Sequence, residues 1–159
     1  MTDKQKLVQL HTIFAQLQWS VRPEQFAVVG IDQRERLVLS QLIGHIKDPF
    51  FHMVVEPQEV TLILTESDWR VLRPAFTRPR IQYNYRLIAF DEDLPADLVG
   101  FLATITTALA QANVSVLTIC SYAKDYVLVH EKDLDPALRS IEQTVSQYRS
   151  TPASTPPAS

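Results

Sequence analysis

Cysteine and glycine are scarce in this sequence, and their scarcity excludes several classes of site. Cys120 is the single cysteine among 159 residues. It cannot form an internal disulfide, so nothing in the sequence requires an oxidising compartment, and we expect a cytoplasmic protein. The three glycines, Gly30, Gly44 and Gly100, form neither a G-x-G-x-x-G fingerprint nor a phosphate-binding loop, which argues against nucleotide hydrolysis.

Catalytic and metal-ligand spacings are absent as well. The four histidines fall in no H-x-x-x-H pattern, and one cysteine cannot complete a zinc site. No G-x-S-x-G motif occurs, and no acid, base and nucleophile stand at a recognisable spacing. We therefore expect no enzyme, no metal and no cofactor. The acidic run of residues 91–93 leaves two interpretations open: a solvated loop leading into a helix, or a site for a metal or an amine.

Positive charge is concentrated in one segment only. The net charge of -3 gives no general reason to expect nucleic acid or an anionic membrane as a partner. The segment from Trp69 to Phe90, however, has five arginines, interleaved aromatic residues and no acid. Proteins that bind single-stranded nucleic acid combine arginine with aromatic rings in this way. The same segment joins two halves of the chain, where arginines can pair with acids and rings can fill a core, so nucleic acid is the less favoured partner.

Residues 98–123 form a stretch without charge that is long enough to span a bilayer. The stretch contains eight threonine, glutamine, asparagine and serine side chains, and its hydrophobic periodicity changes at Asn113. A helix followed by a buried strand accounts for this pattern better than a membrane span. We therefore expect no association with a membrane.

The first half of the chain opens with an amphipathic helix. Leu7, Leu10, Phe14 and Leu17 recur at helical spacing, which predicts a helix over residues 3–18 that ends in the 19–23 segment. After it, apolar runs and turn residues predict, in order, a strand at 26–31, a helix at 38–46, a hairpin of 51–55 and 60–64, and a short helix at 67–76.

The second half repeats this order. The pattern predicts a strand at 85–90, a helix with Pro95 in its first turn, strands at 114–120 and 126–129, and a helix capped by Asp135. From Ser150 the chain contains only serine, threonine, proline and alanine, which predicts a disordered tail. The expected organisation is an N-terminal helix over 1–22, units over 23–80 and 81–149, and a tail over 150–159.

Each half therefore follows the order β-α-β-β-α. Two such units predict an α+β fold of two tandem ferredoxin-like units, each an antiparallel sheet with helices on one face, and an extra N-terminal helix. A final strand is missing from each half in this prediction. Exchange of strands between the halves would supply it.

The second half also resembles a known family. Its pattern is a strand, a loop with Gly100, a helix that ends in Ala-Asn-Val-Ser, a second strand, an aromatic turn, and Asp-Tyr-Val-Leu-Val at 125–129. Over residues 85–145 this is similar to the second ACT domain of small bacterial proteins with two ACT domains and of the paired-ACT arginine sensors. Glu59 to Leu64 is similar to the corresponding strand of the family's first unit, and residues 10–29 resemble the helix and strand that open some members.

The resemblance implies a site for an amino acid at the interface between units. In the family, the loop before the first helix presents backbone N–H groups to the ligand carboxylate. The corresponding positions here are Leu98, Val99, Gly100 and Phe101, and the facing wall is formed by Ile119, Cys120, Ser121 and Tyr122. Gly100 would let the ligand approach the backbone closely. A structural role for Gly100, tight packing of the helix on the sheet, is the alternative.

One position departs from the arginine-sensor pattern. Ala123 stands where those proteins have an acidic residue after the aromatic, although Asp125 or an acid from the 91–93 run could substitute. The resemblance implies a non-catalytic protein that binds an amino acid or similar metabolite in a regulatory or sensing role, and a homodimer formed through sheet edges or helix faces. A protein-protein interaction module of the same fold that has lost its ligand is the alternative, and Ala123 supports it.

Overall fold

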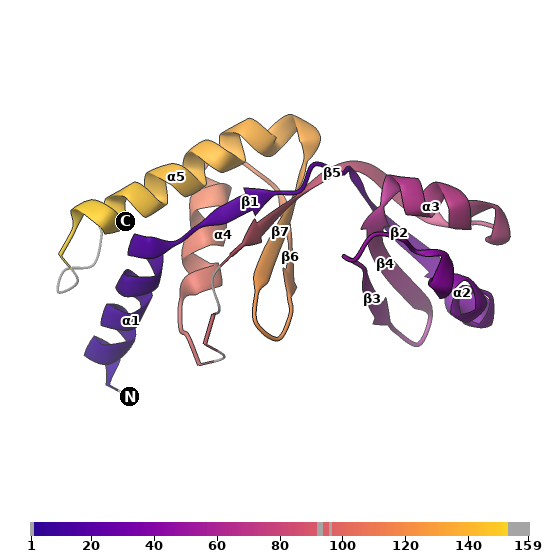
Figure 1. Ribbon diagram of the computed structural model, residues 1–159, viewed down its shortest axis with the longest axis horizontal. Helices are drawn as coiled ribbons and strands as arrows, with labels where there is room; N and C mark the ends of the chain where they lie inside the picture. The colour runs from indigo at the N-terminus through magenta and orange to yellow at the C-terminus, as the bar shows by residue number, and fades with distance from the viewer. Residues whose placement is uncertain (1, 92–93, 96, 153–159) are drawn as a thin grey trace. The chain divides into compact units, whose positions relative to one another are not determined.

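The computed structural model describes residues 2–91, 94–95 and 97–152 and divides the chain into two compact units. One unit is Pro23–Arg86, and the other combines Met1–Arg22 with Leu87–Ser159. The division falls inside a single strand, β5 (Arg80–Phe90), whose first residues belong to one unit and whose last residues belong to the other (Figure 1). Glu92 and Asp93 of the acidic run and residues 153–159 of the expected tail lie outside the described residues.

The unit Pro23–Arg86 is an antiparallel sheet with the strand order β3-β4-β2-β5. Its elements are β2 (Phe26–Asp32), η1 (Gln33–Glu35), α2 (Arg36–Leu42), η2 (Ile43–His45), β3 (His52–Val55), β4 (Glu59–Thr65), α3 (Glu66–Leu72), η3 (Arg73–Ala75) and the first part of β5. Every strand and helix predicted for residues 26–76 is therefore present.

The core of this unit lies between the sheet and its two helices. Alternate residues of β2 and β4 are buried against Leu39 of α2 and Leu72 of α3. Trp69 and Phe76 stack in the same core with ring centroids 5.7 Å apart, so these two rings of the arginine-rich segment are unavailable to nucleic acid bases. Full burial of an aliphatic side chain such as Leu39 or Leu72 stabilises the fold by about 1.5–3 kcal/mol.

The second unit has the strand order β1-β5-β7-β6. Its elements are α1 (Asp3–Gln16), β1 (Trp19–Val21), the end of β5, α4 (Phe101–Gln111), β6 (Val116–Cys120), β7 (Asp125–His130), η4 (Glu131–Asp133) and α5 (Leu134–Ser150). Residues of α1, α4 and α5 share one core with Ile88 and Phe90 of β5 and with Val127 and Val129 of β7. The helices thus cover one face of this sheet, and the predicted α+β fold of two ferredoxin-like units with an N-terminal helix is confirmed.

The fourth strand of each unit comes from a segment for which the sequence predicted no strand. Residues 80–82 of β5, ahead of the strand predicted at 85–90, pair with β2 and complete the sheet of Pro23–Arg86. In the other unit, β1 pairs with the end of β5, with Trp19 opposite Phe90 and Val21 opposite Ile88. The 19–23 segment, which was expected only to end the first helix, therefore also contributes a strand to the sheet.

Two predicted helix starts are wrong. Pro95 does not lie in the first turn of a helix, because α4 begins at Phe101 after Gly100, whose left-handed backbone cannot continue a helix. Asp135 lies in the first turn of α5 instead of capping it; the N-cap is Asp133, whose side chain makes no capping hydrogen bond.

The long uncharged stretch folds as a helix and a strand, as predicted. Its residues form α4 and β6, which are separated by the left-handed Asn113. Within the described residues, no helix combines the length and the apolar character that a membrane crossing needs.

Candidate ligand-binding site

The loop before α4 ends in a backbone conformation that glycine adopts easily. Gly100 has φ 95° and is the N-cap residue of α4. Other residues rarely adopt this conformation, because their Cβ would clash with the backbone. No side chain caps α4, whereas Thr2 caps α1 and Thr65 caps α3. The first backbone N–H groups of α4 therefore lack the side-chain acceptor that these other two helices have.

Gly100 also serves packing within its unit. A Cβ at this position would lie 3.3 Å from Cδ2 of Leu10 in α1, closer than most such contacts. The loop thus approaches α1 tightly, which agrees with the structural role considered for this glycine. The positive φ and the close contact both favour glycine, and neither excludes a ligand at the helix N-terminus.

The remaining loop residues predicted to bind ligand fall into two groups. Phe101 is buried, with its ring 5.2 Å from that of Phe14 and 5.3 Å from that of Phe90. Leu98 is half-buried against the same core, whereas Val99 is 56% exposed. The Phe101 ring therefore anchors α4, and only its backbone N–H remains a candidate contact.

The facing wall is the end of β6 and the turn after it. Ile119 is buried, Cys120 and Ser121 are exposed, and Tyr122 is fully exposed. Ser121 shapes the turn: its N–H and its hydroxyl both donate to the carbonyl of Lys124, at 2.8 and 2.9 Å. Of these four predicted residues, Tyr122 has the side chain most free to contact a ligand.

A hydrogen bond from the Cys120 thiol to Asp125 raises the pKa of the thiol to about 11, with burial as a smaller cause. The thiol is therefore protonated at neutral pH and has little nucleophilic character. Asp125 is occupied by this contact, which makes it a poorer substitute for the acid that is missing at Ala123.

Two direct contacts bring the loop and the turn together. The N–H of Leu94 donates to the carbonyl of Ala123 at 3.0 Å, and Nζ of Lys124 lies 3.4 Å from Oδ1 of Asp91. These contacts tie residues just before the predicted loop 98–101 to residues just after the predicted wall 119–122 within the same unit. Sequence reasoning missed Lys124, because a single lysine in a turn is ordinarily only a solvated charge.

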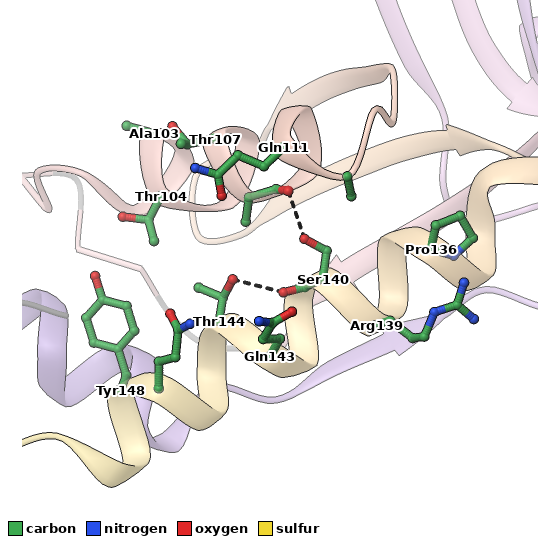
Figure 2. Close-up of a pocket in the computed structure, with 13 residues that line it drawn as sticks. Ala103, Thr104, Thr107, Gln111, Pro136, Arg139, Ser140, Gln143, Thr144 and Tyr148 are labelled. Atoms are coloured by element: carbon green, nitrogen blue, oxygen red, sulfur yellow. Dashed lines mark hydrogen bonds between the residues drawn. The ribbon is translucent and has the colours of Figure 1, made fainter. Parts of the chain in front are cut away.

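A second feature of this unit is a groove between α4 and α5 (Figure 2). It has a volume of about 740 Å³ and is lined by alanine, serine, threonine and glutamine side chains together with Pro136, Arg139 and Tyr148. Ser140 Oγ donates to the carbonyl of Ala108 at 2.8 Å across the two helices. No sequence motif marks this groove, since its small and polar residues look like ordinary solvated helix faces.

Nothing in the described residues suggests a metal site. No three histidine, cysteine, aspartate or glutamate side chains among them lie close enough together to hold an ion. The metal interpretation of the 91–93 run concerns Glu92 and Asp93, which lie outside that part of the chain.

The second half of the chain is similar to a known protein family. Residues 80–143 match the family model of the ACT domain. By that match, this segment is similar to an ACT domain. The cytosolic arginine sensor for mTORC1, subunit 1, of Mus musculus is 24% identical over 104 residues, which are 63% of this chain and 31% of the mouse protein. The human protein of the same name is 24% identical over 105 residues, so the match spans about a third of these relatives.

Solved structures of aspartate kinases share the fold. The Clostridium acetobutylicum enzyme matches with a TM-score of 0.65 and 21% identity, over 80% of this chain and 34% of the enzyme. The ligand-free regulatory subunit of aspartate kinase from Thermus thermophilus matches with a TM-score of 0.64 and 12% identity, over 79% and 95% of the two chains. These likenesses establish the ACT-type fold, and the predicted family resemblance is confirmed.

Proposed function

We propose that this protein binds an amino acid or a similar small metabolite at the loop before α4 and has a regulatory or sensing role without catalysis. The observation that carries the proposal is the N-terminus of α4, which begins at left-handed Gly100 and has no side-chain cap. Helix N-termini attract anions, because their first N–H groups lack partners and the helix dipole is positive there. A ligand carboxylate would accept hydrogen bonds from these groups.

Asp91 is the best-placed acid for the ligand amino group. It lies at the turn that contains Ala123, through its ion pair with Lys124. Both charged side chains are more than a third exposed, so a ligand could exchange with this pair at little cost. Asp91 would then replace the acid that the arginine-sensor pattern has at position 123, while Tyr122 would cover the ligand.

The comparisons support this class of ligand. The mouse and human relatives are named as arginine sensors, and one structural relative is a regulatory subunit. Arginine is therefore the first amino acid to test, although the matched segment is only part of each sensor. A cytoplasmic location and the absence of enzymatic activity belong to the same proposal.

Thermal unfolding of the purified protein with each of the twenty amino acids tests the proposal. A ligand that binds only the folded state raises the free energy of unfolding by about 2.7 kcal/mol at a hundredfold excess over its dissociation constant. We expect one or a few amino acids to raise the unfolding temperature, and Asp91→Asn to weaken the effect. Asp97→Asn is the matched control, because Asp97 is an exposed acid of the same loop.

A protein-protein interaction module without a ligand is the second candidate. The groove between α4 and α5 favours it, because the groove is open and has a mixed lining of alanine, threonine and glutamine, whereas small-molecule sites are typically enclosed and apolar. If no amino acid shifts the unfolding temperature, the binding proposal is wrong and this alternative takes its place. An interaction module would instead lose its partner on Gln143→Arg in the groove.

A further inference from the structure

The strand β1 is an edge of the sheet in the second unit, and α5 lies beside it (Figure 1). Among the described strands, β1 pairs only with β5. The side chains of Trp19 and Val21 pack against the core on the helix side of the sheet. With four residues of α5 they line a groove of about 520 Å³: Leu138, Arg139, Glu142 and Gln143. A strand edge and a largely apolar groove therefore meet at the same two residues of β1.

We propose that this groove binds an extended segment of another protein. The segment adds a strand to β1, places apolar side chains between β1 and α5, and carries an acidic residue near Arg139. None of the residues predicted to bind an amino acid lines this groove, so the proposal does not rest on the proposed ligand site.

The pairing with β5 decides which backbone groups of β1 are available. The N–H of Arg22 donates to the carbonyl of Leu87 at 2.9 Å, so position 22 is hydrogen-bonded to β5. In an antiparallel pair, hydrogen-bonded positions alternate along the strand. Ser20 is then the next hydrogen-bonded position, and Trp19 and Val21 direct their N–H and C=O groups toward the open edge.

These open backbone groups favour an extended chain as the occupant. A segment antiparallel to β1 would exchange hydrogen bonds with Trp19 and with Val21. Residues opposite each other in a sheet share a face, so the segment's side chains opposite Trp19 and Val21 would enter the groove. Peptides that bind in this way gain affinity from main-chain hydrogen bonds and specificity from pockets for alternate side chains. The expected pattern in the partner is thus two apolar residues separated by one residue.

Pro23 limits the length of this pairing. It takes the next outward position after Val21 but has no N–H to donate. The edge therefore offers little beyond the three residues of β1. Proline and shortness are also devices by which proteins prevent unrestricted pairing of sheet edges. An edge of this kind suits a short linear segment better than a long flat strand.

The rim of the groove carries an exposed arginine, Arg139. Arg139 forms no ion pair with any acid among the described residues. The acid of the same groove, Glu142, lies 3.9 Å from Nη1 of Arg149, so its charge is already compensated. An acidic residue of the partner would therefore pair with Arg139. Such a pair is exposed, and its main effects are on the rate of association and on the register.

Selection from a library of random octapeptides displayed on phage tests the proposal with a defined probe. We expect the enriched peptides to share two apolar residues separated by one residue, with an acid nearby. Fluorescence anisotropy of the labelled peptides then measures their affinity. Val21→Pro removes an outward N–H and none of the hydrogen bonds to β5, and it should weaken binding by about tenfold or more.

Met53→Pro is the matched control for this substitution. The N–H of Glu56 donates to the carbonyl of Glu59 at 2.8 Å, so by the same alternation Met53 is an outward position of β3. The strand β3 is an edge of the other unit, and Met53→Pro should leave the affinity for the peptides unchanged. Circular dichroism checks that both variants are folded.

A charge reversal tests the groove without touching the backbone. Arg139→Glu should weaken binding of the enriched peptides by about fivefold, the effect of losing an exposed attraction and adding a repulsion. Replacing the acid of the peptide by lysine should restore the affinity for Arg139→Glu. Arg70→Glu, the same change at an exposed position of α3 in the other unit, should have no effect.

Thr107→Arg separates this groove from the one between α4 and α5, because Thr107 lines only the latter. It should leave peptide binding unchanged. The proposal is overturned if no peptide is enriched over an unrelated protein, if Val21→Pro and Met53→Pro bind equally well, or if Thr107→Arg abolishes binding. It is also overturned if Val21→Pro halves the mass of the parent in light scattering, because a second copy then occupies the edge.

Discussion

Glu59 of β4 and Arg80 of β5 form an ion pair across Gly30 of β2, the strand that lies between them. The pair is possible because Gly30 has no side chain. A Cβ at Gly30 would lie only 2.6 Å from Oε2 of Glu59. The Glu59 carboxylate thus lies over Gly30 on the sheet surface and reaches the guanidinium of Arg80, two strands away.

Gly30→Ala should have opposite consequences in two backgrounds. When Glu59 is replaced by alanine, the space above Gly30 is free. Gly30→Ala should then stabilise the protein by about 0.4–1 kcal/mol, because it restricts the unfolded chain. In the parent, the new methyl group displaces Glu59, and loss of the ion pair offsets that gain. Urea denaturation of the four proteins measures the coupling. An equal effect of Gly30→Ala in both backgrounds would show that the ion pair does not depend on the glycine.

Asp68 should contribute more to stability than an exposed acid. Its buried carboxylate accepts hydrogen bonds from the backbone N–H groups of Lys47 and Asp48, at 3.1 and 3.0 Å, and thereby fixes the loop before β3. Asp68→Asn presents an NH₂ group to one of these donors. We expect a loss of about 1–3 kcal/mol in the free energy of unfolding, the cost of a buried unpaired donor.

Asp135→Asn is the control for this measurement, because Asp135 is exposed in the first turn of α5. Surface substitutions of this kind usually change stability by about 0.5 kcal/mol or less. If the two variants unfold at the same urea concentration, the carboxylate of Asp68 does not hold the loop.

The sequence predicts most helices and strands of this fold because their burial is periodic. Alternating or helical apolar positions mark β2, β4, α4 and α5, whose inward residues form the two cores. In contrast, β1 has three residues, too few to show a period, and the first residues of β5 are largely exposed. Both become strands only because distant partners offer them backbone hydrogen bonds.

The candidate site could be predicted in part for a related reason. Gly100 stands out in a chain with three glycines, and its positive φ confirms an unusual backbone there. The contact between Leu94 and Ala123 uses backbone atoms only, which no residue pattern reveals. The burial of the Phe101 ring likewise depends on α1, a helix distant in the sequence whose Phe14 contacts this ring.

Cys120 should react slowly with alkylating reagents despite its exposure. The thiolate is the reactive form, and Asp125 holds the thiol pKa near 11, above its ordinary value of 9.0. The rate of reaction with iodoacetamide should therefore rise with a midpoint near pH 11. Asp125→Asn should move that midpoint toward its ordinary value and accelerate the reaction at pH 8.

The same shift sets the sign of a pH effect on stability. Because the folded protein holds the thiol proton more tightly than the unfolded chain, this contribution is complete below about pH 9 and is lost as the pH rises toward 11. Cys120→Ser should remove this part of the alkaline loss. A parent and a Cys120→Ser variant that lose stability identically between these pH values would contradict the assignment.

Ala123→Asp should strengthen the binding of a cationic amino acid if the loop before α4 is the ligand site. The substitution adds a carboxylate beside Lys124 and leaves the backbone carbonyl that accepts from Leu94 in place. We expect tighter binding of arginine by calorimetry, by about tenfold for a new charge-assisted hydrogen bond worth about 1.5 kcal/mol. Ser115→Asp, an exposed position between α4 and β6, adds the same charge away from the loop and should leave the affinity unchanged.

The two variants also separate a local contact from a general effect of charge. If Ser115→Asp strengthens binding as much as Ala123→Asp, the gain comes from the lower net charge of the chain, and position 123 has no special place in the site. If Ala123→Asp weakens binding, its carboxylate competes with Asp91 for Lys124, and the amino group of the ligand is then recognised elsewhere. Only a gain confined to position 123 supports a ligand between the loop and the turn.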